Sequence, residues 1–489
     1  MGSGLGGLVC GYILAKNGYE VVVLEKNNQM GGSLQTFTRK STKFNTGMHY
    51  IGSMEPGQIL YRFFNYLNLL NDVKISKLDP AGYDIFSIAG KRYHFASGFN
   101  NFTEELTKQF PNHRQEIQLY VKNILEIANT SPLYKLHEIN NHEFTETESI
   151  KTSVNEFLNS ITKNQQLQNV LAGNLPLYAG IKDKTPTYIH ALINNFYIQS
   201  AFRIMGGSDA IANSLANSIR SFGGKVFTHA EVVKINCDAE KVTSVQLSNG
   251  ELCETNYLIS NIHPHATLTK IDSPLIRKAY RIRISELENT VSNFSVYIKF
   301  KENRTPYLNY NYYYYEHDDV WKNREKWSDN YLYMHQCTTD NAVFADSAKI
   351  ICPMHYNEVK KWENSTTGNR GSDYLEFKED KANQLLQKLE ESFPGINSAV
   401  DTYYTSTPLT NSNYTATKEG AMYGIVRDKN FPARTFISQR SKIPNLFFTG
   451  QNINFHGILG VTMGAIITSA EFLGINTIIK QIEEENNGL

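Results

Sequence analysis

Glycines and an acidic residue near the start of the chain have a spacing that can bind a phosphate-containing cofactor. Gly2, Gly4 and Gly7 match the loop pattern of dinucleotide-binding folds, and Glu25 follows at about the distance at which a carboxylate binds a ribose. The first two glycines let the backbone turn and approach a pyrophosphate, while the third lets helix and strand pack closely. A helix that begins at this loop directs its positive end toward phosphate groups. We therefore expect a bound dinucleotide here.

The elements that would position this loop are evident on one side only. Apolar residues recur at helical spacing over 5–17, and 21–24 is the continuous apolar run of a buried parallel strand. Before the loop, where a central strand is usual, there is only Met1. A missing central strand would remove ~9–18 kcal/mol of apolar burial. We therefore expect the native reading frame to begin upstream, with an apolar strand that ends just before the loop.

A second glycine pair follows the acidic residue. Gly31 and Gly32 permit another close approach of the backbone to the cofactor, which is typical of enzymes that bind FAD. Together with the GMHYIG stretch at 47–52, these motifs resemble the FAD-dependent family of phytoene desaturases, carotenoid isomerases and retinol saturases. The chain differs from the family pattern at Ser33, where a basic residue is usual, and keeps a threonine at Thr36. The resemblance extends over nearly the whole chain and implies FAD as the cofactor.

Two later segments complete the cofactor site that the resemblance implies. In this family the segment at 206–235 lies beside the adenine end of FAD, through the backbone near Val232, although an ordinary helix–strand unit explains it equally well. The strand, turn and long apolar helix at 443–474 would close the flavin site, with Asn452 at the ribityl chain and the helix N-terminus at the flavin pyrimidine. The implied cofactor-binding residues are Gly2, Gly4, Leu5, Gly6, Gly7, Glu25, Lys26, Gly31, Gly32, Ser33, Val232, Gly450, Gln451, Asn452, Gly460 and Val461.

The order of the segments predicts the fold class and the domains. Helix–strand alternation returns after a long stretch of different character, which predicts an α/β protein whose cofactor domain is built from discontinuous segments. The resemblance implies that this domain is a Rossmann-like, glutathione reductase-type FAD-binding domain. This domain comprises 1–74, 201–288 and 428–489. The segments 75–200 and 289–427 predict an α+β substrate-binding domain with a mainly antiparallel sheet. Alternation in its strands predicts one buried and one exposed face.

Candidate proton donors lie in segments that the family places near the flavin. Saturating a double bond takes a hydride equivalent from reduced flavin and a proton from an acid or from water. His49, Tyr50, Tyr423 and His456 are the catalytic candidates, and histidine titrates near neutrality. Simple packing around the flavin ring is an alternative of at least equal weight for each of them.

The resemblance implies an FAD-dependent oxidoreductase that acts on CH–CH groups of a hydrophobic polyene or isoprenoid. A redox-neutral cis–trans isomerase of carotenoids is an alternative that uses the same cofactor. A non-catalytic lipid-binding or escort protein of the same fold is another, although the intact flavin-facing segment at 449–460 argues against it. The sequence leaves open the electron partner, the direction of the reaction and the particular lipid.

Composition excludes several other classes. The 489 residues carry 48 basic and 48 acidic side chains and no polybasic block, so no nucleic-acid partner is expected. The five cysteines are scattered, and His263 with His265 supplies too few ligands for a metal. No apolar stretch is long enough to span a bilayer, and no signal pattern is evident, so we expect a cytoplasmic protein. The apolar stripe at 58–70 is either a core helix or an interfacial helix in peripheral contact with a membrane.

Overall fold

Two parallel β-ladders form the centre of one half of the molecule. A computed structural model of the protein describes residues 1–131, 134, 148–322, 327–336, 338–340, 342–453 and 455–487. Strand β1 (Val22–Leu24) pairs with β9 (Lys225–Phe227), and β13 (Leu258–Ser260) pairs with β19 (Leu446–Phe448). The four strands come from sequence segments far apart, as expected for an α/β fold assembled from discontinuous pieces.

The opening residues lie between these two ladders. The Met1 nitrogen donates a hydrogen bond to the Ile259 carbonyl at 2.9 Å, and the Asn261 nitrogen donates to the Met1 carbonyl at 2.9 Å. On the other side, the Gly2 nitrogen donates to the Leu24 carbonyl at 2.8 Å. Main-chain hydrogen bonds of Met1 and Gly2 thus connect β1 to β13.

Helix α1 (Leu5–Lys16) forms the core of this half. It packs against α10 (Asp209–Ser221) and α17 (Gly457–Leu473), and Leu8 and Ile13 of α1 are fully buried. An antiparallel sheet extends from the same half and consists of β10 (Val232–Cys237), β11 (Val242–Leu247) and β12 (Leu252–Glu254). The C-terminus of α1 is closed by Asn17, whose Nδ2 donates to the Ile13 carbonyl at 2.8 Å. These contacts fix the N-terminus of α1 at the loop of glycines.

A seven-stranded sheet forms the second half. Its order is β18-β14-β17-β16-β15-β6-β7, and neighbouring strands are antiparallel except β15 and β6, which are parallel. The strands are β6 (Asp84–Ile88), β7 (Lys91–Phe95), β14 (Ser292–Phe300), β15 (Asn311–Tyr315), β16 (Asn330–His335), β17 (Ser347–Met354) and β18 (Val400–Ser406). The predicted mainly antiparallel sheet is confirmed.

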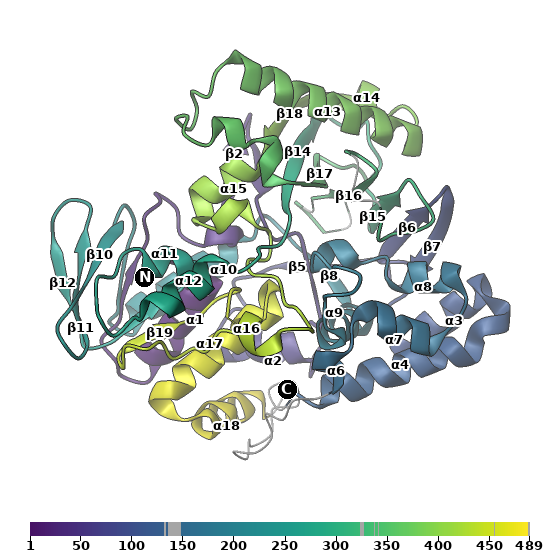
Figure 1. Cartoon of the computed structure of the whole chain (residues 1–489). Helices are drawn as coiled ribbons and strands as arrows, with labels where there is room; N and C mark the ends of the chain where they lie inside the picture. Colours follow the sequence, from purple (N-terminus) through teal and green to yellow (C-terminus); the bar gives the residue numbers. More distant parts are fainter. Residues whose placement is uncertain are drawn as a thin grey trace.

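The central strands of this sheet are buried on both faces, so the expectation of one exposed face is wrong for them. All but one residue of β14 is buried, and β16 is buried throughout. Helix α13 (Ser372–Ser392) packs its Leu385 and Leu389 against one face of the sheet, at the top of Figure 1. The other face borders a cleft that separates it from the opposite half of the molecule.

Helices and a small sheet connect the two halves. The helical layer consists of α3 (Phe99–Gln109), α4 (Arg114–Asn129), α6 (Glu148–Lys151), α7 (Val154–Ile161), α8 (Gln165–Leu171) and α9 (Thr187–Gln199), drawn in blue in Figure 1. Strand β8 (Ala201–Ile204) lies between β4 (Tyr50–Gly52) and β5 (Ile75–Lys77). In this small sheet, β4 and β8 come from the expected FAD-binding domain and β5 comes from the expected substrate-binding domain. The domain boundaries near 74 and 200 stay predictions.

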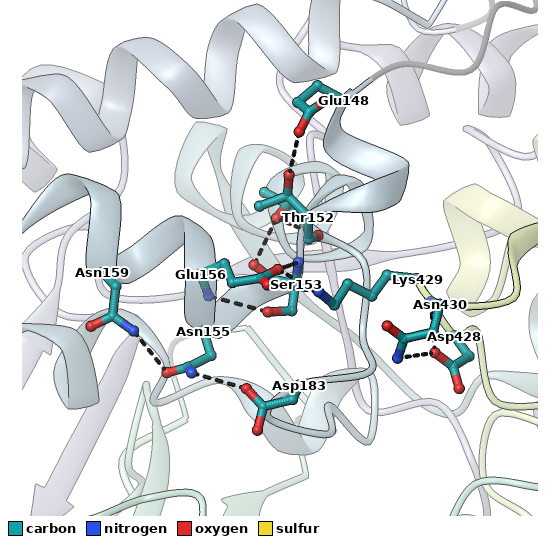
Figure 2. A network of polar contacts seen from close by, with 11 residues as sticks. Glu148, Thr152, Ser153, Asn155, Glu156, Asn159, Asp183, Asp428, Lys429 and Asn430 are labelled. Carbon is teal, nitrogen blue, oxygen red and sulfur yellow. Dashed lines mark hydrogen bonds and ion pairs between the residues drawn. The ribbon is translucent and has the colours of Figure 1, made fainter.

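A polar network ties the start of α7 to the segment at 428–430 (Figure 2). Ser153 and Glu156 form a capping box, in which the Glu156 nitrogen donates to Ser153 Oγ at 3.1 Å and the Ser153 nitrogen to Glu156 Oε2 at 2.7 Å. Lys429 Nζ then donates to Glu156 Oε1 at 2.7 Å, and the Lys429 nitrogen donates to the Lys184 carbonyl at 2.8 Å. The network therefore fixes the position of residues 428–430, which precede β19 and α17 in the sequence.

The apolar stripe at 58–70 is a core helix. Helix α2 (Ile59–Tyr66) has fully buried Leu60 and Phe63 side chains and packs against α18 (Ile475–Asn486). Within the described ranges, no single helix has the length and apolar composition to cross a membrane. Helices α17 and α18 meet that criterion only as a pair bent by 119°.

Candidate functional site

A large cleft lies between the parallel ladders and the seven-stranded sheet. Its volume is about 1130 Å³, and its walls come from the opening loop, from 24–39, from the start of α17 and from β14, β16 and β17. Binding sites for drug-sized ligands typically have ~300–1,000 Å³, so this cleft can hold a ligand as large as a dinucleotide.

Three sequence-distant segments approach one another backbone to backbone at this cleft. A Cβ on Gly7 would lie 2.2 Å from the Gly2 carbonyl oxygen, and one on Gly6 would lie 3.0 Å from the Gly450 nitrogen. A Cβ on Gly32 would lie 3.2 Å from the Gly4 Cα. Since real side chains cannot adopt the shortest of these separations, glycine is required where the loop turns beneath the cleft. The backbone wall is therefore preformed.

Glu25 ends β1 at the edge of the cleft with its carboxylate fixed. The side chain is 5% exposed, and Oε2 accepts hydrogen bonds from the Ser3 nitrogen at 3.0 Å and from Ser3 Oγ at 2.7 Å. Oε1 accepts from the Asn27 nitrogen at 2.9 Å. An ionised carboxylate has about four acceptor positions, so Glu25 keeps capacity for the hydroxyl groups of a ligand.

Ser3, which sequence reasoning missed, connects this acid to the second glycine pair. Its Oγ also accepts a hydrogen bond from the Gly31 nitrogen at 3.2 Å. The signal was available, because a small hydroxyl residue lies between the two loop glycines, directly above the strand end that carries Glu25.

The third segment supplies a buried oxygen and a helix N-terminus. Asn452 is 6% exposed, lines the cleft, and its Oδ1 finds no hydrogen-bond donor among the described residues. A Cβ on Gly424 would lie 2.0 Å from this oxygen, so Gly424 leaves the room that Asn452 occupies. Ile458 and Val461, near the N-terminus of α17, also line the cleft. An unpaired acceptor beside the positive end of a helix fits a polar ligand with donor groups.

A smaller apolar pocket of about 70 Å³ opens beside the same helix end. It is lined by Leu177, Ile189, Leu192, Ile193, Phe196 and Met463, among others. Leu177, Tyr197, Gly457 and Ile458 line both this pocket and the large cleft. The two spaces therefore meet at the N-terminus of α17, where an apolar ligand and a polar cofactor can lie against each other.

His456 lines the smaller pocket. Its ring centroid lies 4.8 Å from that of Tyr423, and its Nε2 has no hydrogen-bond partner within the described ranges. Burial, with a smaller effect of the Arg427 charge, lowers the pKa of His456 to about 3. Its imidazole is therefore neutral near pH 7. Tyr423 lines the large cleft, and its hydroxyl donates to the Pro176 carbonyl at 3.1 Å.

His49 lies beside a buried lysine that sequence reasoning also missed. Lys349 Nζ donates to the Thr46 carbonyl at 2.6 Å and lies 3.1 Å from His49 Nε2. Burial lowers the pKa of Lys349 to about 7. Burial and the charges of Lys349 and Arg203 hold the pKa of His49 well below its usual range. His49 is therefore neutral at neutral pH. Its lysine neighbour was not predictable because Lys349 lies 300 residues away in the sequence.

Tyr50, the next catalytic candidate, is hydrogen-bonded to a carboxyl group. Its hydroxyl donates to Asp84 Oδ2 at 3.1 Å and lies 2.6 Å from the Tyr313 hydroxyl. Burial, followed by the Asp84 charge, raises the pKa of Tyr50 well above its usual value. Tyr50 lines the cleft, whereas Asp84 lies behind it and is 1% exposed.

The structure brings most of the residues named from the sequence to this one cleft. Those lining it are Gly2, Gly4, Leu5, Gly6, Glu25, Lys26, Gly31, Gly32, Ser33, Val232, Gly450, Gln451, Asn452 and Val461, together with His49, Tyr50 and Tyr423. Gly7 packs behind the loop instead, and Gly460 lies against Phe455, where a Cβ would come within 2.5 Å of the Phe455 Cβ. Lys26 Nζ donates to the Asn413 carbonyl at 2.6 Å.

The two histidines of the HPH motif at 263–265 lie outside any metal-binding group in the part of the chain that the structure describes. His263 Nε2 is 3.0 Å from Asn289 Oδ1, and His263 Nδ1 accepts from the His265 nitrogen at 3.2 Å. The motif therefore caps the short helix α11 (Pro264–Leu268).

Comparison with known proteins agrees with this geometry. The model of the family described as flavin containing amine oxidoreductase matches residues 5–471. All-trans-retinol 13,14-reductase of Macaca fascicularis is 28% identical, over 97% of this chain and 85% of its own length. The 4,4'-diaponeurosporene oxygenase of Staphylococcus aureus (strain USA300) is 22% identical, over 93% of this chain and 93% of its own.

Solved structures share the fold. The crystal structure of an oxidoreductase from Methanosarcina mazei superposes with a TM-score of 0.65 at 17% identity, covering 95% of this chain and 98% of that chain. The glycine cradle, the fixed acid and the unpaired Asn452 oxygen fit a flavin dinucleotide. The chain belongs to the flavin-containing amine oxidoreductase family, and it is an oxidoreductase that uses FAD.

Proposed function

We propose that this chain transfers hydrogen to a carbon–carbon double bond of a hydrophobic polyene. The observation that carries the proposal is the junction of the large cleft with an apolar pocket, at Leu177, Tyr197 and Ile458. A polyene offers few polar groups for recognition, so an apolar pocket that opens beside a cofactor cleft suits it. The names of the relatives, which refer to retinol and to diaponeurosporene, are consistent with that substrate class.

FAD, when bound, supplies the two-electron redox chemistry of the reaction. The residues of this chain suited to hold it are the loop from Gly2 to Gly6 at the N-terminus of α1, for the pyrophosphate, and Glu25, for ribose hydroxyls. Asn452 and the N-terminus of α17 are suited to the other end of the dinucleotide, because they present an acceptor and partial positive charge.

Side chains around the junction would position the substrate and exclude water. The apolar residues of α9 and α17 enclose the hydrocarbon, and His456 Nε2 can bond to a terminal hydroxyl of the substrate. Tyr50 lines the cleft and carries a hydroxyl proton, and the Tyr197 ring packs against the Tyr50 ring at a tilt, with ring centroids 4.5 Å apart. The ring of Tyr197, which lines both spaces, therefore keeps Tyr50 beside the junction.

The proposal is tested with purified protein reconstituted with FAD. The flavin is reduced anaerobically with dithionite, all-trans-retinol is added, and the extracted lipid is analysed by mass spectrometry. We expect a product heavier by two hydrogen atoms and reoxidation of the flavin. An isomer of unchanged mass would instead indicate a redox-neutral isomerase. Retained but unaltered polyenes, across retinol and carotenoid substrates, would contradict the proposal and indicate a binding protein.

A further inference from the structure

A buried polar cluster lies behind the cleft, where three strands begin. Asp84 is the first residue of β6, Asn311 is the first residue of β15, and the two are paired in register. Tyr50, the first residue of β4, reaches the same cluster from the other half of the molecule. Tyr313 completes it, two residues after Asn311 on the same face of β15.

The hydrogen bonds of the cluster form a line from the interior to the cleft. Asn311 Nδ2 donates to Asp84 Oδ1 at 2.8 Å, while Asp84 Oδ2 is bonded to the Tyr50 hydroxyl at 3.1 Å. Of these residues, Tyr50 lines the cleft. One oxygen of Asp84 is thus held by an amide, and the other is held by the hydroxyl group of a residue that lines the binding space.

We propose that Asp84 supplies, through the Tyr50 hydroxyl, the proton that a double bond takes up when it is reduced at this site. The proposal rests on the proposed function, which provides a hydride from reduced FAD to one carbon of the double bond. The other carbon then gains its hydrogen as the Tyr50 O–H bond breaks and a C–H bond forms. The proton on Asp84 moves to the Tyr50 oxygen, and the remaining Asp84 carboxylate regains a proton from water that enters after the product leaves.

The electrostatic surroundings keep a proton on Asp84. Burial raises the pKa of this carboxyl to about 7, against the opposing effects of hydrogen bonds from Asn311 and Tyr50 and of the Arg203 charge. Arg203 directs its Nη2 to the Tyr310 carbonyl at 2.7 Å. The remaining titratable neighbours are the hydroxyl groups of Tyr83, Tyr197 and Tyr313, whose pKa values burial raises. They stay neutral, so the proton of Asp84 is the one that can leave near neutral pH.

Two substitutions test the line of transfer in the reconstituted holoenzyme. Tyr50→Phe should lower the rate of polyene reduction by about 100-fold or more, the usual effect of losing a general acid, while FAD content is retained. Asp84→Asn keeps a hydrogen-bonding group next to Tyr50 but no transferable proton, and should lower kcat with little change in KM. Asp84→Glu should restore part of the rate. Tyr333→Phe is the control, since it removes another buried tyrosine hydroxyl, on β16 of the seven-stranded sheet, which is bonded to His335 Nε2 at 2.6 Å.

The pH profile separates proton supply from a structural role. Because the protonated acid is the active form, the rate of polyene reduction in the unaltered protein should fall as pH rises above about 7. That fall should disappear in Asp84→Asn and remain in Lys349→Met, whose lysine has a pKa of about 7 in the folded protein. A carboxylic-acid band in the infrared spectrum should titrate in the same range and be absent from Asp84→Asn, independently of turnover.

The outcomes distinguish this inference from the proposed function. If the unaltered protein reduces no polyene, the proposed function fails, whatever the variants do. If it reduces polyene and both Asp84→Asn and Tyr50→Phe keep its rate and pH profile, the relay is overturned and the proton comes from another source. A carboxylic-acid band that persists in Asp84→Asn would also contradict the assignment.

Discussion

The wall of the cleft beside α1 consists mainly of backbone, whereas the opposite wall, on the seven-stranded sheet, consists of side chains. On the first wall, Gly2, Gly6 and Gly32 bring main chain against main chain, and one carboxylate, Glu25, is fixed by its neighbours. On the second wall, Lys349 and Tyr297 project into the cleft from separate strands.

The two walls respond differently to substitution. A backbone wall has fixed donors and no room for a Cβ, so one added atom displaces the main chain itself. The properties of a side-chain wall depend on how its polar groups are buried and paired. Substitutions there first change the pKa values of neighbouring side chains and the choice of ligand.

Adding one methyl group directly behind the glycine loop that forms the backbone wall should remove the cofactor. In Gly7→Ala the Cβ would lie 2.2 Å from the Gly2 carbonyl oxygen, so the loop has to move. We expect protein that purifies almost without flavin absorbance, and a lower melting temperature. Gly464→Ala is the matched control, because a Cβ built there meets no described atom within 4 Å other than the nearby backbone of its own helix. Equal flavin content in the two variants would contradict the rigid backbone wall.

Neutralising the acid of the same wall should weaken FAD binding without abolishing it. In Glu25→Gln the amide nitrogen faces the donors of Ser3 or Asn27, and charge-assisted hydrogen bonds are lost. The expected cost of about 1.5–3 kcal/mol corresponds to a roughly 10- to 100-fold higher Kd for FAD. Flavin titration by fluorescence measures it. The exposed Glu20, changed to Gln, should leave the Kd unaltered, and an equal loss in both variants would show that Glu25 has no particular role.

Removing the buried charge of the side-chain wall should change how stability depends on pH. Burial lowers the pKa of Lys349 to about 7 from its ordinary 10.5, so between these values the unfolded chain binds more protons than the folded protein. The free energy of unfolding should therefore rise with pH across this window, by up to ~1.4 kcal/mol per pH unit from this group. In Lys349→Met this contribution should vanish.

Urea unfolding at several pH values between 7 and 10 measures the slope, with Lys360→Met as the control at an exposed lysine. The same slope in Lys349→Met and in the unaltered protein would mean that the ammonium is solvated. The His49 pKa, followed by NMR of labelled histidine, should rise in Lys349→Met because the neighbouring positive charge is gone.

The smallest effect is expected in the apolar pocket and on one class of substrate. His456 Nε2 has no hydrogen-bond partner among the described residues, so a polyene alcohol that enters the pocket can supply one. In His456→Phe we expect kcat/KM for all-trans-retinol to fall about fivefold, the net value of about 1 kcal/mol for one hydrogen bond. A hydrocarbon polyene should be turned over unchanged. An equal fall for both substrates would indicate that His456 acts through packing.

The residues of the backbone wall could be predicted from the sequence, whereas those of the side-chain wall could not, for a physical reason. The glycine loop, Glu25 and the Gln451–Asn452 turn are local patterns, and each is required by a short stretch of backbone geometry, so the sequence predicted them. Asp84 and Lys349 could not be found in this way, because their environment is created by strands far apart in the chain. An aspartate or a lysine within an otherwise largely apolar strand does not show, from the sequence alone, that burial will shift its pKa.

The parallel pairing of β6 with β15 has a consequence for how the chain reaches this structure. Asp84 and Asn311 are separated by 227 residues, yet they pair in register at the seam of the seven-stranded sheet. Until the ribosome has delivered the later strand, the edge of the β6–β7 hairpin has no neighbour and the carboxyl group has no amide to hold it. Pairing between strands so far apart in the sequence forms slowly. The N-terminal half of the chain therefore keeps an unpaired strand edge until β15 has been synthesised, and such an edge is prone to aggregation.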